Sequence, residues 1–270
     1  MAMGGAYGYA PPTYDRRMTA LLVTLAAVVA VAAAIRSTWS PCGLSMLSTI
    51  TPLGESGRRN RWAATATWFI AGAVLGGATL GAGAALLAAG VDALGLSAGT
   101  AVGLAAVLAA VTIASDLKIG GFRLPSHTRQ VNESWLDQFR SWVYGGGFGW
   151  QIGVGLATYV TTSAVYLMLA LAALTASPLA ACLVVTGFGL VRGLAVLLGR
   201  GLTSPDRLMA LHRRLAERLP TAQRAIVLVQ AAVLAVAAAA AWGPLPSIVL
   251  GVAVVAAAVV RQPRPAVRPA

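Results

Sequence analysis

The chain has 270 residues, and its composition differs sharply from that of a soluble protein. Hydrophobic residues make up 58% of it, charged residues make up 10%, and the mean hydropathy is +0.76, whereas soluble domains are about half apolar and a quarter charged. These values exclude a disordered chain, a secreted disulfide scaffold and an ordinary cytosolic enzyme. They predict an all-α integral membrane protein, because helices satisfy their own backbone groups in lipid.

The net charge of +12 comes from arginine, which supplies nineteen of the twenty basic residues. Most of these arginines lie between apolar runs, where basic residues anchor a protein at a membrane face. We therefore expect these basic residues to interact with the lipid bilayer and not with a nucleic acid. Two cysteines are too few for a disulfide framework or a zinc site, so we expect no metal and no cofactor.

Apolar runs and polar segments divide the chain into expected elements. In chain order we expect a disordered tail over 1–17, an added transmembrane helix over 18–37, a first three-helix repeat over 38–115, a cytoplasmic loop with an interfacial helix over 116–147, a second three-helix repeat over 148–242, a last transmembrane helix over 243–260 and a basic tail over 261–270. Within the second repeat, Ser204-Pro205-Asp206 offers an N-cap, a first-turn proline and an early acid. This motif predicts a cytoplasmic amphipathic helix over about 204–219.

The apolar runs predict about eight transmembrane passes. The runs are Met18–Ile35, Trp39–Pro52, Trp62–Ala89, Ser97–Ser115, Phe148–Leu174, Pro178–Leu198, Ala225–Trp242 and Pro246–Val260. The run Trp39–Pro52 is the shortest, at about 21 Å against a hydrocarbon core of about 30 Å. If it only continued the first helix, Arg58, Arg59 and Arg61 would lie on the face opposite the N-terminus. Counting it as a pass places both termini and 18 of the 20 basic residues inside, with Arg36 near the outer face.

An internal repeat relates two of these runs. Gly43–Ile50 aligns with Gly155–Thr162, and each segment opens a group of three runs. Because three crossings is an odd number, this pattern predicts a core of two inverted three-helix repeats, as in transporters whose site lies near the midplane. The repeat segments carry hydroxyl side chains that we expect to bind substrate, namely Ser45, Ser48, Thr49, Thr158, Thr161 and Thr162. The alternative is that these hydroxyls form hydrogen bonds between helices.

A short motif, Ser40-Pro41-Cys42-Gly43-Leu44, follows an apolar helix at the start of the two inverted three-helix repeats. This combination resembles the transmembrane region of the CcdA/DsbD family, which is part of the wider LysE-type group of carriers. The resemblance covers residues 38 to 242. It implies a thiol–disulfide electron conduit in the bacterial cytoplasmic membrane, which passes reducing equivalents from a cytoplasmic thioredoxin-like protein to outward-facing thiol proteins, for example in cytochrome c maturation. Cys42 matches the first redox cysteine of the family and Pro41 the adjoining proline. The second family cysteine has no counterpart, because the repeat has Ile152-Gly153-Val154-Gly155 there.

Two further residues are candidates for the site. Cys182 is the other thiol of the chain, and we expect it to be at most a helper of Cys42; the alternative is that it packs as a small apolar residue. Arg192 lies inside an apolar run, where a charge costs about 2.5–3.5 kcal/mol. We interpret it as the counter-ion of an anionic substrate or of a thiolate, unless its side chain extends to the inner face. No acid lies within the eight runs as drawn, so no carboxylate partner is expected.

Three classes of function remain open. The first is the thiol–disulfide conduit that the resemblance implies. The second is a LysE-type carrier or exporter of a small solute, with an anion favoured by Arg192 and by the hydroxyl-rich segments. The third is a non-catalytic subunit that assists the assembly of a membrane complex. The chain has no Walker motif, HExxH motif or nucleotide fingerprint, which argues against hydrolytic or nucleotide-driven chemistry.

Overall fold

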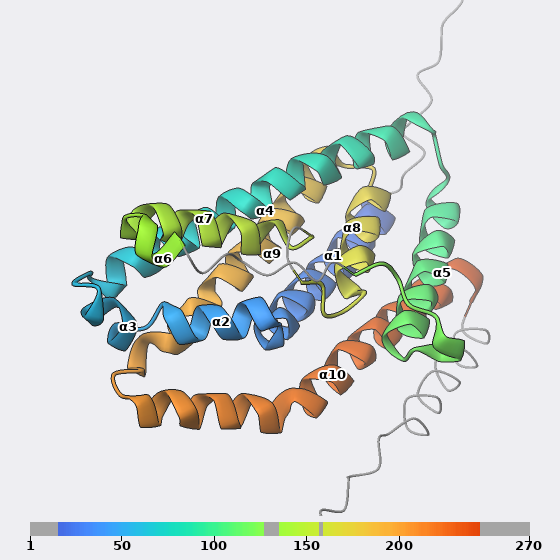
Figure 1. The fold of residues 1–270 in the computed structure, drawn as a ribbon. Coiled ribbons are helices and arrows are strands. Elements are labelled where there is room, and N and C mark those ends of the chain that lie inside the picture. Colours follow the sequence, from blue (N-terminus) through green and yellow to red (C-terminus); the bar gives the residue numbers. More distant parts are fainter. Residues whose placement is uncertain (1–15, 127–134, 157–158, 244–270) are drawn as a thin grey trace, which may run out of the picture.

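The structure, a computed structural model, describes residues 16–126, 135–156 and 159–243 (Figure 1). The described residues form helices and loops and contain no strand. The longer helices are α1 (Arg16–Arg36), α4 (Trp62–Ala93), α5 (Ala98–Asp116), α7 (Ser141–Val154), α8 (Ala164–Leu174), α9 (Pro178–Leu194) and α10 (Pro205–Trp242). The shorter ones are α2 (Pro41–Thr49), α3 (Pro52–Gly57), α6 (Trp135–Gln138) and the 3-10 turns Ser37–Trp39, Ile119–Gly121 and Ala195–Gly201.

Within the described residues, five helical segments are long and apolar enough to cross a membrane. They are Arg16–Trp39, Trp62–Ala93, Ala98–Asp116, Pro178–Gly201 and Pro205–Trp242. Large apolar side chains also face outward on these segments; Leu86 of α4, for example, is 76% exposed. Such side chains are stable against lipid tails and unfavourable in water. The prediction of an all-α, multi-pass membrane protein is thus confirmed.

The expected second pass does not form. Helix α2 has nine residues and is about 14 Å long, well short of the bilayer core. Helix α2 runs alongside α10 in the same direction as α1, because residues later in the α1–α2 segment contact residues progressively earlier in α10. These contacts pair Arg36 with Gln223, Trp39 with the Leu215 carbonyl and Ser48 with His212. The run that follows α1 therefore extends α1 and does not return across the membrane, and the eight-pass count does not fit this structure.

Two other expected boundaries also differ. The run Phe148–Leu174 is divided between α7 and α8, because α7 ends at Val154 and the next residue, Gly155, has a φ of +72°, outside the helical region. The amphipathic segment from 204 to 219 and the following pass instead form one helix, α10, which begins with Ser204 as its N-cap and contains Pro220. The eighth run, Pro246–Val260, and both expected tails lie wholly or largely outside the described residues.

The two aligned repeat segments do not share a structure. Residues 43–49 lie within α2, whereas the described residues of 155–162 lie outside any helix. Eight similar residues in different backbone conformations do not define a structural repeat. The predicted inverted repeat therefore does not fit this structure.

Helix α4 packs closely against α7 through glycines. A Cβ atom added at Gly149 of α7 would overlap the carbonyl oxygen of Phe69. Gly72 faces Gly146, and Gly76 faces Trp150, so the contacts advance in the same direction along both helices. Helices α4 and α7 are therefore parallel, and their backbones touch because no side chain separates them.

Helix α9 packs on α4 in the opposite direction. Gly77 faces Gly189, whereas Gly81, one turn later on α4, faces Cys182, which is earlier on α9. Gly77 and Gly81 are four residues apart in the sequence, a spacing that is typical of closely packed helices, and both contact α9 in the structure. This arrangement fixes the position of the C-terminal half of α9, which carries Arg192.

We expect Gly149→Ala to destabilise the protein by about 1–3 kcal/mol, because the methyl group must push α7 away from the α4 carbonyls. Thermal unfolding in detergent measures this effect. Gly83→Ala is the matched control, since a Cβ atom there meets nothing within 4 Å and alanine favours a helix. Equal unfolding temperatures for the two variants would contradict the close α4–α7 contact.

Candidate functional site

Cys42 lies in the first turn of α2. Ser40 is the N-cap, and its hydroxyl accepts a hydrogen bond from the Gly43 amide at 3.0 Å. Pro41 is the first residue of the helix, where its missing N–H costs no hydrogen bond. The side chain of Cys42 is buried, forms no disulfide, and stands at the positive end of the helix dipole. Pro41 thus starts the helix that carries the thiol.

Arg192 of α9 is buried next to this thiol. Its side chain is 4% exposed, so it does not extend toward either surface. The Nη1 atom donates a hydrogen bond of 2.8 Å to the Ile152 carbonyl, and the guanidinium lies 5.8 Å from the ring centroid of Phe188. Arg192 also interacts electrostatically with Cys42. The structure therefore brings together the cation and the first thiol that the sequence singled out.

Cys182 lies elsewhere on α9. It precedes Arg192 by ten positions, which is about 15 Å along a helix, and its backbone packs against Gly81 of α4. A disulfide needs Cα atoms within about 7 Å of each other. Neither cysteine forms a disulfide in the described structure, and Cys182 lies almost three helical turns from Arg192 along α9.

The hydroxyl residues of α2 mainly satisfy the protein's own groups. Ser48 donates to the Leu44 carbonyl at 2.8 Å and pairs with the His212 ring of α10 at 3.1 Å. Thr49 donates to the Ser45 carbonyl at 2.9 Å. Ser45 is partly buried on the same helix. The contacts of Ser48 and Thr49 are of the kind expected if these hydroxyls form hydrogen bonds within and between helices, which is the alternative to substrate binding.

A second group of predicted residues lines a polar cavity of about 610 Å³. Pro41, Thr161 and Thr162 are among its walls, while Thr158 lies outside the described residues. The cavity also brings together three cationic residues, Arg36, Lys118 and Arg123. The expected topology placed Arg36 near the membrane face opposite Lys118 and Arg123, and the shared cavity shows that assignment to be wrong. It depended on the second pass, which does not form.

Asp116 at the end of α5 organises one wall of this cavity. Its Oδ1 atom accepts hydrogen bonds from the Ser163 amide at 2.8 Å and the Ser163 hydroxyl at 2.5 Å. Its Oδ2 atom accepts from the Thr162 hydroxyl at 2.5 Å and from Gln230 Nε2 at 3.1 Å. The carboxylate thus joins α5, the start of α8 and α10. Sequence reasoning missed it, because the apolar run was ended one residue earlier, at Ser115.

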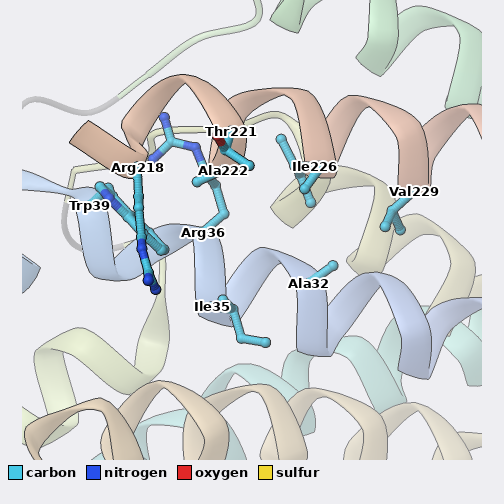
Figure 2. Close-up of a pocket in the computed structure, with 10 residues that line it drawn as sticks. Ala32, Ile35, Arg36, Trp39, Arg218, Thr221, Ala222, Ile226 and Val229 are labelled. Carbon is cyan, nitrogen blue, oxygen red and sulfur yellow. The ribbon is translucent and has the colours of Figure 1, made fainter. Parts of the chain in front are cut away.

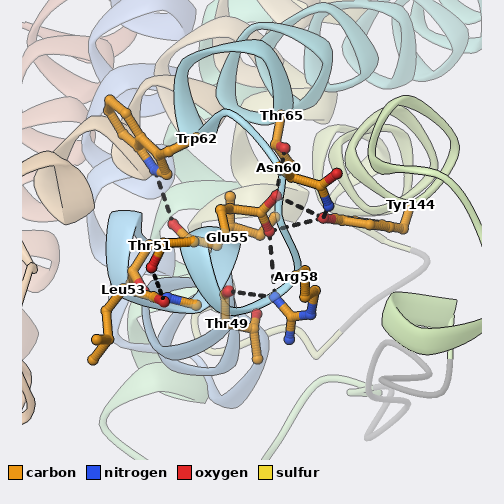
Figure 3. Close-up of polar contacts among 12 residues, drawn as sticks. Thr49, Thr51, Leu53, Glu55, Arg58, Asn60, Trp62, Thr65 and Tyr144 are labelled. Carbon is orange, nitrogen blue, oxygen red and sulfur yellow. Dashed lines mark hydrogen bonds and ion pairs between the residues drawn. The ribbon is translucent and has the colours of Figure 1, made fainter.

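A second carboxylate that the sequence did not single out is Glu55 of α3, which is completely buried (Figure 3). The Tyr144 hydroxyl lies 2.8 and 2.7 Å from its two oxygens, and the Thr65 hydroxyl donates to it at 2.7 Å. Arg58 forms a salt bridge of 3.3 Å with it, and Asn60 donates to the Tyr144 oxygen at 3.1 Å. Burial, and then the hydrogen bond to Glu55, raise the pKa of Tyr144 to about 12. The phenol therefore remains a donor at neutral pH.

We expect Tyr144→Phe to cost about 1.5–3 kcal/mol at neutral pH, because Glu55 loses its phenolic donor. The native state holds the Tyr144 proton more tightly than the unfolded chain, so this stabilisation is complete below pH 10. It is lost as the pH rises from about 10 to about 12. Unfolding curves of both proteins at pH 8 and pH 11.5 should therefore differ less at the higher pH. A constant difference would contradict this role of the phenol.

The buried thiol–arginine pair, the cationic cavity and the apolar helices define a multi-pass α-helical membrane protein with two polar sites. Within the described residues, no three His, Cys, Asp or Glu side chains are grouped to hold a metal ion. No family model and no solved structure matches the chain.

Curated relatives identify the family. The chain is 34% identical over 206 residues to the methylamine utilization protein MauF of Paracoccus denitrificans, an alignment that covers 73% of this chain and 72% of the relative. It is 33% identical to MauF of Paracoccus versutus over 67% of this chain and 66% of that protein, and 34% identical to MauF of Methylorubrum extorquens over 56% and 54%. The chain belongs to the MauF family. It spans slightly less than two thirds of the length of the Paracoccus versutus protein.

Proposed function

We propose that this chain is a membrane accessory protein of bacterial methylamine utilization, and that its chemical step is thiol–disulfide exchange at Cys42. The name of its MauF relatives supports the first part. One observation carries the second: the Cys42 thiol lies both at the N-terminal end of α2 and beside the buried Arg192. A helix N-terminus and an arginine each stabilise a thiolate, which is the nucleophile in disulfide exchange.

A single thiol performs this exchange through mixed disulfides. The Cys42 thiolate attacks an outward-facing partner's disulfide, so that one partner sulfur bonds to Cys42 and the other leaves as a thiolate. A thioredoxin-like dithiol then attacks the Cys42 sulfur and releases the first partner with both of its thiols reduced. The second thiol of the dithiol closes its own disulfide and frees Cys42. Two electrons pass between the partners, as in the CcdA/DsbD-like conduit, and no internal disulfide with Cys182 is needed.

Growth of a methylamine-utilizing bacterium tests this proposal, with the chain as the only copy of its MauF protein. We expect Cys42→Ser to abolish growth on methylamine and Cys182→Ser to retain it, with both proteins present in the membrane at the wild-type level. Full growth with Cys42→Ser would overturn the thiol step. Loss of growth with Cys182→Ser alone would equally contradict a relay through Cys42 that needs no second thiol.

A LysE-type carrier of a small anion is the second candidate function. The observation that favours it is the 610 Å³ cavity with Arg36, Lys118 and Arg123 in its walls. A carrier would not need a thiol, so Cys42→Ser would remain active, whereas Lys118→Gln together with Arg123→Gln would stop transport. The same growth assay therefore separates the two functions.

A further inference from the structure

The last residue of α1 is a buried arginine with unused hydrogen-bonding capacity. Arg36 is 8% exposed, and its Nε and Nη2 atoms both donate to one oxygen of the neutral Gln223 side chain, at 3.2 and 2.9 Å. Its Nη1 atom is buried without a hydrogen-bond partner, and Arg36 forms no salt bridge within the described part of the chain. Asp116 attracts it electrostatically, but that carboxylate is already bound by Thr162, Ser163 and Gln230. A buried cation without a bonded anion is unfavourable, so an external anion fits this position.

An apolar groove of about 530 Å³ between α1 and α10 leads to this arginine (Figure 2). Its apolar walls are Ala32, Ile35, Ala222, Ala225, Ile226 and Val229. Arg36, Arg218 and Trp39 form one end, where Arg36 extends from α1 toward α10. Ile35 is 52% exposed, so the groove opens to the outside of the helix bundle. The groove is therefore apolar along its length and cationic at one end.

The cationic end of the groove lies where α1 and α10 each change from apolar residues to residues that include tryptophan or arginine. The apolar segment that starts at Arg16 ends at Trp39. Helix α10 carries its arginines up to Arg224 and is apolar from Ala225 onward. Tryptophan and arginine are enriched where a helix leaves the hydrocarbon. The groove thus runs from the headgroup level of a bilayer into its acyl region.

We propose that this groove binds an anionic phospholipid, with its phosphate on Arg36 and Arg218 and one acyl chain along the apolar walls. A guanidinium can donate two parallel hydrogen bonds to a phosphate, which would satisfy Nη1 of Arg36. The neighbouring 610 Å³ cavity shares Arg36 and Trp39 with the groove and adds Lys118 and Arg123. These charges strengthen the attraction for an anionic headgroup over a zwitterionic one. The inference goes beyond thiol exchange and does not depend on Cys42.

Native mass spectrometry of the delipidated full chain tests the proposal. The probes are phosphatidylglycerol and phosphatidylcholine with identical acyl chains. We expect phosphatidylglycerol to bind at least about tenfold more tightly, and Arg36→Gln to remove about this factor, the size of a lost charge-assisted hydrogen bond. Arg207→Gln is the control, because Arg207 is an exposed arginine of α10, the other helix beside the groove, and does not line the groove.

Two further variants keep the test decisive if Arg36→Gln does not fold. Arg218→Gln changes an exposed side chain at the cationic end, and Ala222→Phe fills the groove; each should weaken phosphatidylglycerol binding, while Arg207→Gln should not. Equal binding of the two lipids to the wild-type chain, or unchanged binding in these variants, would overturn the proposal. Binding of inorganic phosphate at Arg36 without retention of phosphatidylglycerol would also overturn it, because the site would then belong to a soluble anion.

Discussion

Replacing Arg192 by leucine is expected to abolish thiol exchange at Cys42 without lowering the amount of folded protein. Arg192 is the buried cation that interacts electrostatically with Cys42, and leucine removes that charge. Folding should be maintained or improved, because a charge in an apolar segment costs about 2.5–3.5 kcal/mol. The Ile152 carbonyl also remains bonded in the variant, since it accepts from the Gly155 amide at 3.1 Å. Exchange with a disulfide-containing probe and the unfolding temperature in detergent measure the two effects.

Arg192→Lys is the control for charge. It keeps a cation near Cys42 but not the planar guanidinium over Phe188, so it should retain part of the exchange rate. A leucine variant that folds better and exchanges at the wild-type rate would show that Arg192 is only tolerated in the helix bundle. Loss of folded protein in both variants would instead assign Arg192 a role in packing.

Replacing Asp116 by alanine is expected to destabilise the protein by on the order of 3–5 kcal/mol. Asp116 accepts hydrogen bonds from the Ser163 amide and hydroxyl, from Thr162 and from Gln230, and alanine leaves these donors without their acceptor. The loss should appear as a lower unfolding temperature and as earlier proteolysis between α5 and α8. The cost is large because the carboxylate joins three helices.

Asp92→Ala is the matched control for that variant. Asp92 is an exposed acid near the end of α4, and surface substitutions usually change the stability by less than about 0.5 kcal/mol. Similar unfolding temperatures for Asp116→Ala and Asp92→Ala would contradict the structural role of the Asp116 cluster.

Much of the architecture is predictable from the sequence, but the number of passes is not. Composition predicts an all-α membrane protein, and Ser204-Pro205-Asp206 indicates the residue at which α10 begins. Hydropathy cannot tell whether the run after Trp39 turns back or continues α1, because both courses bury the same apolar residues. That choice depends on contacts with α10 more than 160 residues away, such as Ser48 with His212.

The candidate site is predictable only in part, for a similar reason. Cys42 and Arg192 each stand out, the first beside a proline and the second as a charge among apolar residues, yet their proximity joins positions 150 apart. The buried carboxylates give no comparable signal, because Glu55 and Asp116 both lie just outside apolar runs. Only the structure shows that Glu55 meets Tyr144, 89 positions away.

Thiol trapping in intact cells tests the central claim most directly. Cells grown on another carbon source and then shifted to methylamine are quenched in acid, their free thiols are alkylated, and the membrane protein is separated without reductant. Exchange at Cys42 predicts an adduct with a partner protein that reductant reverses, that persists in Cys182→Ser and that is absent from Cys42→Ser. A Cys42 thiol that is fully free under every growth condition, together with full growth of Cys42→Ser on methylamine, would contradict it.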